Sequence, residues 1–92
     1  MAETQRTTTE EARRVGDEIG VEWDRFDLEQ FRSGMDIELE HGSRDPQTNV
    51  TDDDPIVTGK IALAHMKEFP DYYERLDKME AEAERYWAEK KS

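Results

Sequence analysis

The stretch from Gly59 to Glu80, GKIALAHMKEFPDYYERLDKME, limits the possible folds more strongly than any other part of the sequence. Its first part is almost entirely apolar and carries one histidine, His65. Pro70 then interrupts the chain, because proline removes a backbone donor and clashes with the preceding helical turn. Apolar residues at helical spacing begin again after the proline. We therefore expect two consecutive helices with a sharp break between them.

The first helix of the chain is predicted to begin after Thr8, which forms the sequence pattern of a capping box with Glu11. Gly20 marks its end. One apolar stripe at helical spacing lies between these limits: Ala12, Val15 and Ile19. The residues before Thr8 are polar and show no periodicity. We therefore expect a flexible tail over residues 1–7 and a single helical domain over residues 8–90.

The second predicted helix runs from Leu28 to His41, with Asp27 as its N-cap. It should stop at the following glycine, which occupies the position where left-handed C-caps favour this residue. Gly34, Glu38 and His41 lie together along one edge of its apolar stripe. Because a glycine allows close approach, Glu38 and His41 should border a contact between helices. The stripe itself consists of Leu28, Phe31, Met35 and Leu39.

The third predicted helix runs from Pro55 to about Glu68, with Asp54 as its N-cap. We expect His65 near the centre of its buried side. The loop before this helix ends in a run of acidic residues, but it lacks the alternating ligands, central glycine and closing glutamate of an EF-hand. We interpret these acids as favourable partners of the helix N-terminus rather than as a calcium site. The other residues expected on the buried side are Val57, Ile61, Ala62 and Glu68.

The fourth predicted helix opens at Pro70 or Asp71 and runs towards the C-terminus. Large apolar residues recur along it at helical spacing: Tyr72, Leu76, Met79, Ala83, Tyr86 and Trp87. Such a stripe belongs to a hydrophobic core far more often than to a ligand site. We therefore expect it to be buried.

Four helices with one longer loop predict an all-α fold, either a small four-helix bundle or an irregular four-helix array. The net charge of −11 on 92 residues, with 34% hydrophobic residues, comes close to the composition of disordered chains. The helical spacing of the apolar residues, together with two Trp, three Tyr and four Met, favours a folded domain instead. A chain this short has a limited core, so a second copy could be needed to complete it.

The charge balance restricts the expected partners. The 24 acidic and 13 basic side chains argue against nucleic acid and against an anionic membrane surface. Solubility, a basic protein partner and adaptation to high salt all remain compatible with the acidity. Cysteine is absent, no apolar run approaches the ~20 residues of a membrane span, and the amino end lacks the apolar core of a signal peptide. These features predict a cytoplasmic protein.

Two pairs of residues carry the chemistry that the sequence offers. Glu38 and His41 are one turn apart on the second helix, and His65 and Glu68 are one turn apart on the third, in the opposite order. If the two helices pack together, the four side chains form a ligand set suited to zinc, iron or manganese. Di-iron carboxylate bundles use Glu-x-x-His twice in the same order, plus two further glutamates. Candidates to complete a set of that kind are Glu18, Glu22 and Asp71.

The same residues also admit a structural interpretation. His41 lies in the last turn of its helix, where an imidazolium complements the helix dipole. His65 could be a core histidine that hydrogen-bonds Glu68, Tyr72 or Tyr73. We favour this structural network over a metal site, and a metal site over acid-base catalysis, because the sequence has no nucleophile with an adjacent base and no phosphate-binding loop.

The leading functional hypothesis is a small acidic, non-enzymatic binding or accessory module, whose partner is another protein or a second copy of the chain. The alternative is a metal-binding protein that holds a divalent transition metal on the Glu-x-x-His and His-x-x-Glu pairs. An enzyme ranks behind both hypotheses, and the metal-binding alternative includes possible enzymatic activity.

Three motifs are together typical of one family: ELEHG at Glu38–Gly42, GKIALAH at Gly59–His65 and DYYERLDKME at Asp71–Glu80. On these motifs the chain resembles the small prokaryotic and phage proteins catalogued as a domain of unknown function, DUF5661. The resemblance extends from about Ala12 to Glu80. It implies an all-helical fold, and it brings no activity, cofactor or catalytic residue with it. Further matching residues are Ile19, Gly20, Trp23, Phe31, Gly34, Asp53, Asp54 and Pro55.

Overall fold

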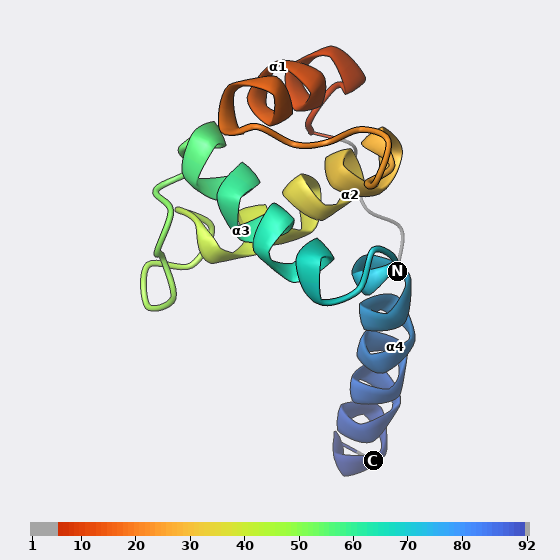
Figure 1. Ribbon diagram of the computed structural model, residues 1–92. Helices are drawn as coiled ribbons and strands as arrows, with labels where there is room; N and C mark the ends of the chain where they lie inside the picture. The colour runs from red at the N-terminus through yellow and green to blue at the C-terminus, as the bar shows by residue number, and fades with distance from the viewer. Residues whose placement is uncertain (1–5, 92) are drawn as a thin grey trace.

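The computed structural model describes residues 6–91, which form four α-helices and one short 3-10 helix (Figure 1). The α-helices are α1 (Thr9–Ile19), α2 (Leu28–Glu38), α3 (Pro55–Glu68) and α4 (Tyr72–Lys91). The 3-10 helix η1 (Leu39–His41) continues directly from α2. No strand occurs in this part of the chain. The predicted all-α fold with four helices is confirmed, and its arrangement is irregular because α4 leads away from the other helices.

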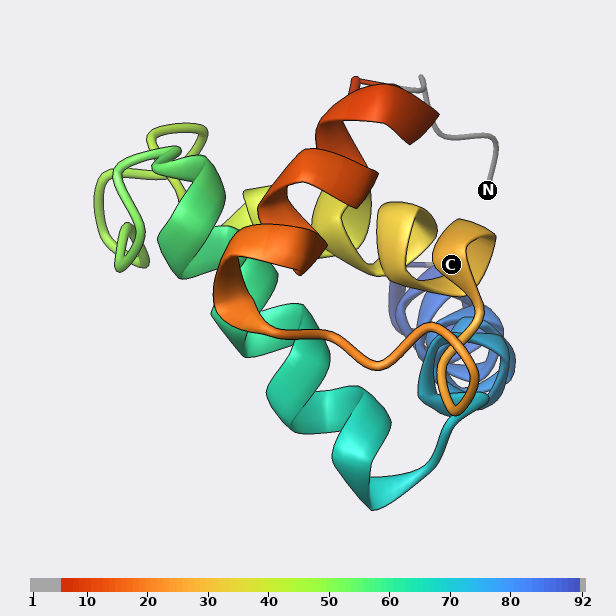
Figure 2. The same ribbon diagram turned by 45° about the horizontal axis from the view of Figure 1, so that its top comes forward.

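The hydrophobic core lies between α1, α2, α3 and the first turns of α4 (Figure 2). Phe31 of α2 and Met66 of α3 are fully buried at its centre. Trp23, in the connection after α1, packs its ring edge-on against Phe31, with the ring centroids 5.7 Å apart. We call residues 6–76 the base of the molecule. Its buried apolar residues are Ala12, Val15, Val21, Phe26, Phe31, Met35, Ala62, Met66 and Tyr73.

Helix α1 begins and ends as its sequence predicts. The Thr8 hydroxyl accepts a hydrogen bond from the Glu11 backbone N–H at 3.1 Å, and the Thr8 backbone N–H donates to the Glu11 carboxylate at 3.2 Å. This reciprocal pair is a complete capping box. Gly20 ends the helix in the left-handed conformation, with φ of 85°, which a residue without a side chain adopts at little cost.

The chain enters α1 through two residues that α2 holds in place. The backbone N–H of Thr7 donates to the Asp36 carboxylate at 2.8 Å, and Arg32 donates to the same carboxylate at 2.9 Å. The backbone N–H of Arg6 also points to Asp36, at 3.4 Å. The rest of the expected flexible tail, residues 1–5, lies outside the described residues, and the domain boundary near residue 8 stays a prediction.

The end of α2 differs from its predicted form. The α-helix ends at Glu38, and the last predicted turn is the tighter η1. Gly42, which follows η1, has φ of −100°, so the predicted left-handed cap is wrong. A Cβ on Gly42 would overlap the Asp53 carboxylate, so a larger residue there would displace that side chain from its present position. That carboxylate accepts a hydrogen bond from the Ser43 backbone N–H at 3.0 Å and so closes the loop between η1 and α3.

Helix α3 has the predicted limits, and its N-cap is Asp54, whose carboxylate accepts hydrogen bonds from the backbone of the first turn. The side that it turns to the core is rotated from the predicted one, and of the five residues expected there only Ala62 is fully buried. Val57 is 39% exposed, Glu68 is exposed, and the His65 side chain lies at the edge of the buried side, 31% exposed. The prediction that His65 lies near the centre of this side is therefore wrong. The buried residues of α3 are Thr58, Gly59, Ala62 and Met66.

The physical reason is that α3 is apolar around most of its circumference, so its pattern alone does not select one side. Gly59 selects the side of α3 that faces the core, because Val15 of α1 packs into the space that a Cβ on this residue would need. Burial of the Thr58 hydroxyl costs little free energy, because the hydroxyl donates a hydrogen bond to the Asp54 carbonyl at 2.7 Å.

Helix α4 packs against α2 and α3 only through its first turns, which belong to the base. Tyr73 is buried, and Tyr72 and Leu76 pack against the core. Beyond these turns the helix extends away from the base, and Figure 1 shows its C-terminal half standing clear of the other helices. Residues 81–90 are all exposed. The expectation that the whole apolar stripe of this helix is buried is therefore wrong for its C-terminal half.

Candidate functional site

A buried carboxylate, that of Glu38, lies where α2, α3 and α4 meet. Glu38 is only 2% exposed. Its Oε2 atom accepts a hydrogen bond from the Tyr73 hydroxyl at 2.6 Å and lies 3.0 Å from Nδ1 of His65. The Tyr73 hydroxyl and His65 Nδ1 are themselves 3.1 Å apart. We call Glu38, His65 and Tyr73 the polar junction, because each comes from a different helix.

The hydrogen-bond chemistry of the polar junction is complete within the chain. An ionised carboxylate only accepts hydrogen bonds, so the His65 tautomer with its proton on Nδ1 supplies a second donor beside the Tyr73 hydroxyl. Burial of a charge costs least when such donors surround it. Among residues 6–91, no buried side-chain nitrogen or oxygen lacks a partner.

The electrostatics of the junction keep Tyr73 protonated. Burial raises the pKa of Tyr73 far above its ordinary value of 10.0, and the hydrogen bond to Glu38 and the negative charge of that carboxylate raise it further. Burial, the Glu38 charge and the Glu68 charge also raise the pKa of Tyr72. Tyr73 is therefore held in its protonated form, in which its hydroxyl donates to Glu38.

Two neighbouring contacts hold α4 against the base at the junction. The ring of Tyr73 occupies the space that a Cβ on Gly34 of α2 would need, so only glycine allows the ring to reach Glu38. Tyr72 stacks on the imidazole of His65, with ring centroids 4.4 Å apart and ring planes 6° apart. The two consecutive tyrosines thus attach the start of α4 to both α2 and α3.

The structure brings together some of the predicted metal ligands. Glu38 and His65 are in contact, and Nε2 of His41, whose side chain is exposed, lies 3.9 Å from Oε1 of Glu38. Glu68 is exposed and contributes only its charge, which acts on Tyr72. No group of three or more His, Cys, Asp or Glu in the described part of the chain is arranged to hold a metal ion. The assignment of these four residues as ligands stays a prediction.

The sequence indicated Glu38 and His65 as candidate site residues and Gly34 as a position of close helix contact. It did not indicate the hydrogen bond between Tyr73 and Glu38. Tyr73 was expected only as a partner of His65, since a helical wheel describes one helix at a time. A sequence signal for the contact between Tyr73 and Glu38 is the pair of tyrosines directly after Pro70. A chain that reverses direction at the proline returns these large amphipathic rings towards the preceding helix.

A second candidate site is the exposed apolar side of α4. Met79, Tyr86 and Trp87 are 59%, 53% and 62% exposed. The rings of Tyr86 and Trp87 pack edge to face, with centroids 5.1 Å apart, and the ammonium group of Lys90 lies over the Tyr86 ring, 5.5 Å from its centroid. We call Met79, Ala83, Tyr86 and Trp87 the α4 face. None of the helices within residues 6–91 is long and apolar enough to cross a membrane.

The fold and these two sites define a class of protein: a small all-α domain with a hydrogen-bonded polar junction and a protruding helix that carries an uncovered apolar face. The family is shown by sequence comparison. A family model described as "Protein of unknown function (DUF5661)" matches residues 12–82, and the chain belongs to this family. No curated protein and no solved structure matches the chain.

Proposed function

We propose that this protein is a small acidic, non-enzymatic binding module and that the α4 face is its binding surface. The observation that carries this proposal is the exposure of Met79, Tyr86 and Trp87 on a helix that stands away from the base. Clustered exposed apolar side chains usually mark an interaction site, because leaving them in water costs free energy.

The composition of the α4 face supports a protein partner. Tyr and Trp are enriched among the residues that dominate binding energy at protein interfaces, since each combines a large apolar surface with few rotatable bonds. The segment beyond Leu76 also has little tertiary packing to stabilise it, and isolated helices shorter than ~12–15 residues are marginal in water. A partner that covers the face would therefore stabilise this helix as well as bind it.

The polar junction has a supporting role in this proposal. Its hydrogen bonds to Tyr73 and the stacking of Tyr72 on His65 fix the first turn of α4, and with it the direction in which the α4 face points. A helix held at one end by buried contacts presents its other end with a defined orientation, which lowers the entropic cost of binding.

The acidity of the chain narrows the class of partner. A net charge of −11 repels nucleic acids and anionic membranes, so the proposal takes a protein or a second copy as the occupant of the α4 face. A chain without cysteine suits a reducing compartment, and the proposal places the module in the cytoplasm.

Photo-crosslinking tests whether the α4 face is the binding surface. The photoreactive residue p-benzoylphenylalanine is placed at position 87, in the α4 face, and the protein is irradiated inside cells that produce it. The matched control carries the same residue at position 81, which is exposed on the opposite side of the same helix. Crosslinked species are separated by gel and identified by mass spectrometry.

We expect a discrete crosslinked species from position 87 that is absent from position 81. The species contains either a second copy of this chain or a different polypeptide, and both support the binding function. Equal crosslinking from the two positions, or none from position 87, contradicts the proposal, because an interaction surface must distinguish the two sides of the helix.

A further inference from the structure

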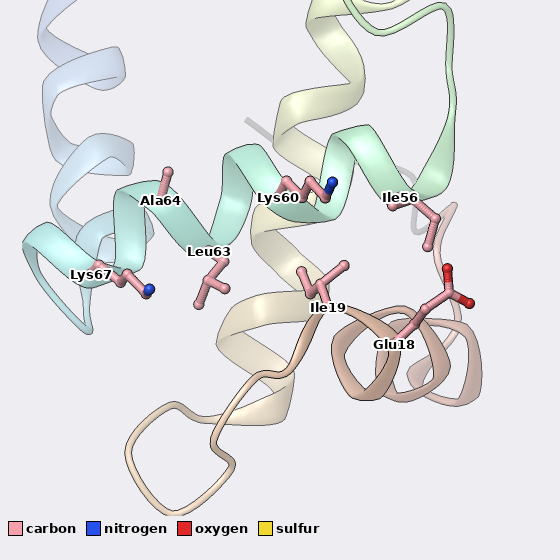
Figure 3. A pocket seen from close by; sticks show the side chains of 7 residues that line it. All are labelled: Glu18, Ile19, Ile56, Lys60, Leu63, Ala64 and Lys67. Atoms are coloured by element: carbon pink, nitrogen blue, oxygen red, sulfur yellow. The ribbon is translucent and has the colours of Figure 1, made fainter.

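An apolar groove lies between the C-terminal end of α1 and the outer side of α3 (Figure 3). Its volume is about 370 Å³. Ile19 from α1 and Leu63 from α3 face each other across it, and Ile56 lies at one end. These residues are only partly buried, so the groove offers apolar surface to an incoming side chain. The charged residues of the lining are Lys60 and Lys67 of α3 and Glu18 of α1.

With two lysines and one glutamate in its lining, this groove has a positive formal charge, opposite in sign to that of the molecule as a whole. Lys60 and Lys67 are exposed, and neither forms an ion pair with any described residue. On a chain with a net charge of −11, a groove whose lining carries two ammonium groups and one carboxylate is a locally positive region, and it favours an apolar segment that carries acidic side chains.

The α4 face has the complementary properties. Glu82 and Glu89 lie along one edge of this face, on the same helix and seven positions apart. Lys60 and Lys67 are also seven positions apart along α3. Seven residues span about 10.5 Å of α-helix, so the two acidic and the two basic groups have matching spacing.

The α4 of a given molecule cannot fill its own groove. In Figures 1 and 3, α3 lies between α1 and α4, and α4 leads away from the side on which the groove opens. We infer that the α4 face binds in the α1–α3 groove of a second copy, with Glu82 and Glu89 beside Lys60 and Lys67, and that two copies exchange their helices reciprocally. This inference rests on the proposed function, since it names the occupant that covers the α4 face. A reciprocal exchange closes the pair with twofold symmetry.

Charge reversal tests this arrangement by sedimentation equilibrium from micromolar to millimolar protein concentration. We expect the wild type to form dimers. The variant Lys60→Glu/Lys67→Glu and the variant Glu82→Lys/Glu89→Lys should each raise the dimer dissociation constant by roughly tenfold or more, because each places like charges against each other. The control Arg25→Glu/Arg44→Glu changes the net charge as much as the lysine variant does, at exposed residues outside the groove and the α4 face, and should retain the dimer.

The decisive measurement is an equimolar mixture of the two reversed variants. In a mixed dimer, the unchanged acidic helix of one chain meets the unchanged basic groove of the other, and the two reversed surfaces also meet with opposite charges. We therefore expect the mixture to recover dimers that neither variant forms alone. Trp87→Ala should weaken the wild-type dimer while the melting temperature of the monomer stays the same, since this side chain is exposed in the monomer.

Three results overturn the inference. One is a wild type that is monomeric throughout the concentration range, and another is a dimer that persists in Lys60→Glu/Lys67→Glu. The third is a mixture of reversed variants that stays monomeric although both variants melt as the wild type does. If a crosslink from position 87 then identifies another polypeptide, the binding function stands without self-exchange. If no crosslink forms, both proposals fail.

Discussion

The base and the projecting part of α4, residues 79–90, carry the same kind of sequence pattern and have opposite environments. In the base, the apolar stripes of α1 and α2 face each other and α3, and Phe31 is fully buried. In the projecting part, an equally regular stripe leaves Trp87 62% exposed. Helical periodicity therefore shows that a face favours burial, but it does not show whether the same chain provides the cover.

The contrast extends to polar side chains. Glu38 in the base is 2% exposed and accepts hydrogen bonds from two other helices, whereas Glu82 on the projecting part is exposed. The same residue type is thus a structural linker in one region and a surface charge in the other. Substitutions made in matched pairs can test how far the two regions differ in their contribution to stability.

The largest difference is expected between the aromatic residues Phe31 and Trp87. Phe31→Ala should lower the free energy of unfolding by about 3–5 kcal/mol, because it removes a fully buried ring and leaves a cavity. Trp87→Ala should change it by about 0.5 kcal/mol or less, as is usual for exposed positions. Urea unfolding followed by circular dichroism, at a protein concentration at which sedimentation shows a monomer, measures both. Comparable losses in the two variants would mean that the projecting helix is packed in solution.

The second difference concerns the carboxylates Glu38 and Glu82. Glu38→Ala should destabilise the fold by about 1–3 kcal/mol, since it leaves the buried hydroxyl of Tyr73 and the Nδ1–H of His65 without their acceptor. Glu82→Ala should stay within about 0.5 kcal/mol of the wild type. Thermal melts at pH 7 compare the two variants. A Glu38→Ala protein as stable as the wild type would show that the polar junction does not hold α4 to the base.

Removal of the Tyr73 hydroxyl should have a smaller effect at neutral pH. Tyr73→Phe keeps the ring in its place against Gly34 but deletes one of the hydrogen bonds to Glu38, at a cost of about 0.5–1.5 kcal/mol. Urea unfolding at pH 7 measures this loss. A loss as large as that of Phe31→Ala would indicate that the ring itself has moved, which the methyl signals of the core in NMR spectra would reveal.

The same tyrosine should make stability dependent on alkaline pH. The pKa of Tyr73 is raised in the folded protein, so above pH 10 the unfolded chain releases this proton while the folded chain retains it. The folded state then binds more protons, and the free energy of unfolding falls as the pH rises above 10. Tyr73→Phe removes this contribution, so its stability should fall less steeply than that of the wild type between pH 9 and 11. Parallel curves for the two proteins would argue against a buried Tyr73 hydroxyl.

The limits of the helices could be predicted from the sequence because they depend on residues that are close together in the chain. The capping box of Thr8 and Glu11, the N-caps Asp27 and Asp54, and the end at Gly20 are all present as predicted. Each involves a side chain and backbone groups within a few positions. The early end of α2 at Glu38 was not predicted, and neither was the contact of Asp53 with Gly42, which brings together residues eleven positions apart.

The candidate sites were only partly predictable for a related reason. Glu38 and His65 were identified as a pair that could converge, and they do. The contact of Tyr73 with Glu38 joins residues 35 positions apart on helices whose packing order was unknown. The side of α3 that faces the core was also unpredictable, because this helix is apolar around most of its surface and Gly59 acts through a contact with α1.

The sequence by itself determined an acidic all-α chain, its family, and the starting points of its helices. These follow from composition, from matching residues and from hydrogen bonds that each helix makes within its own turns. Only the tertiary structure decided that Tyr73 joins Glu38 and His65 and that the second half of α4 leaves the base. Both results depend on how separate helices pack, and that packing is selected by the shape and volume of many side chains at once.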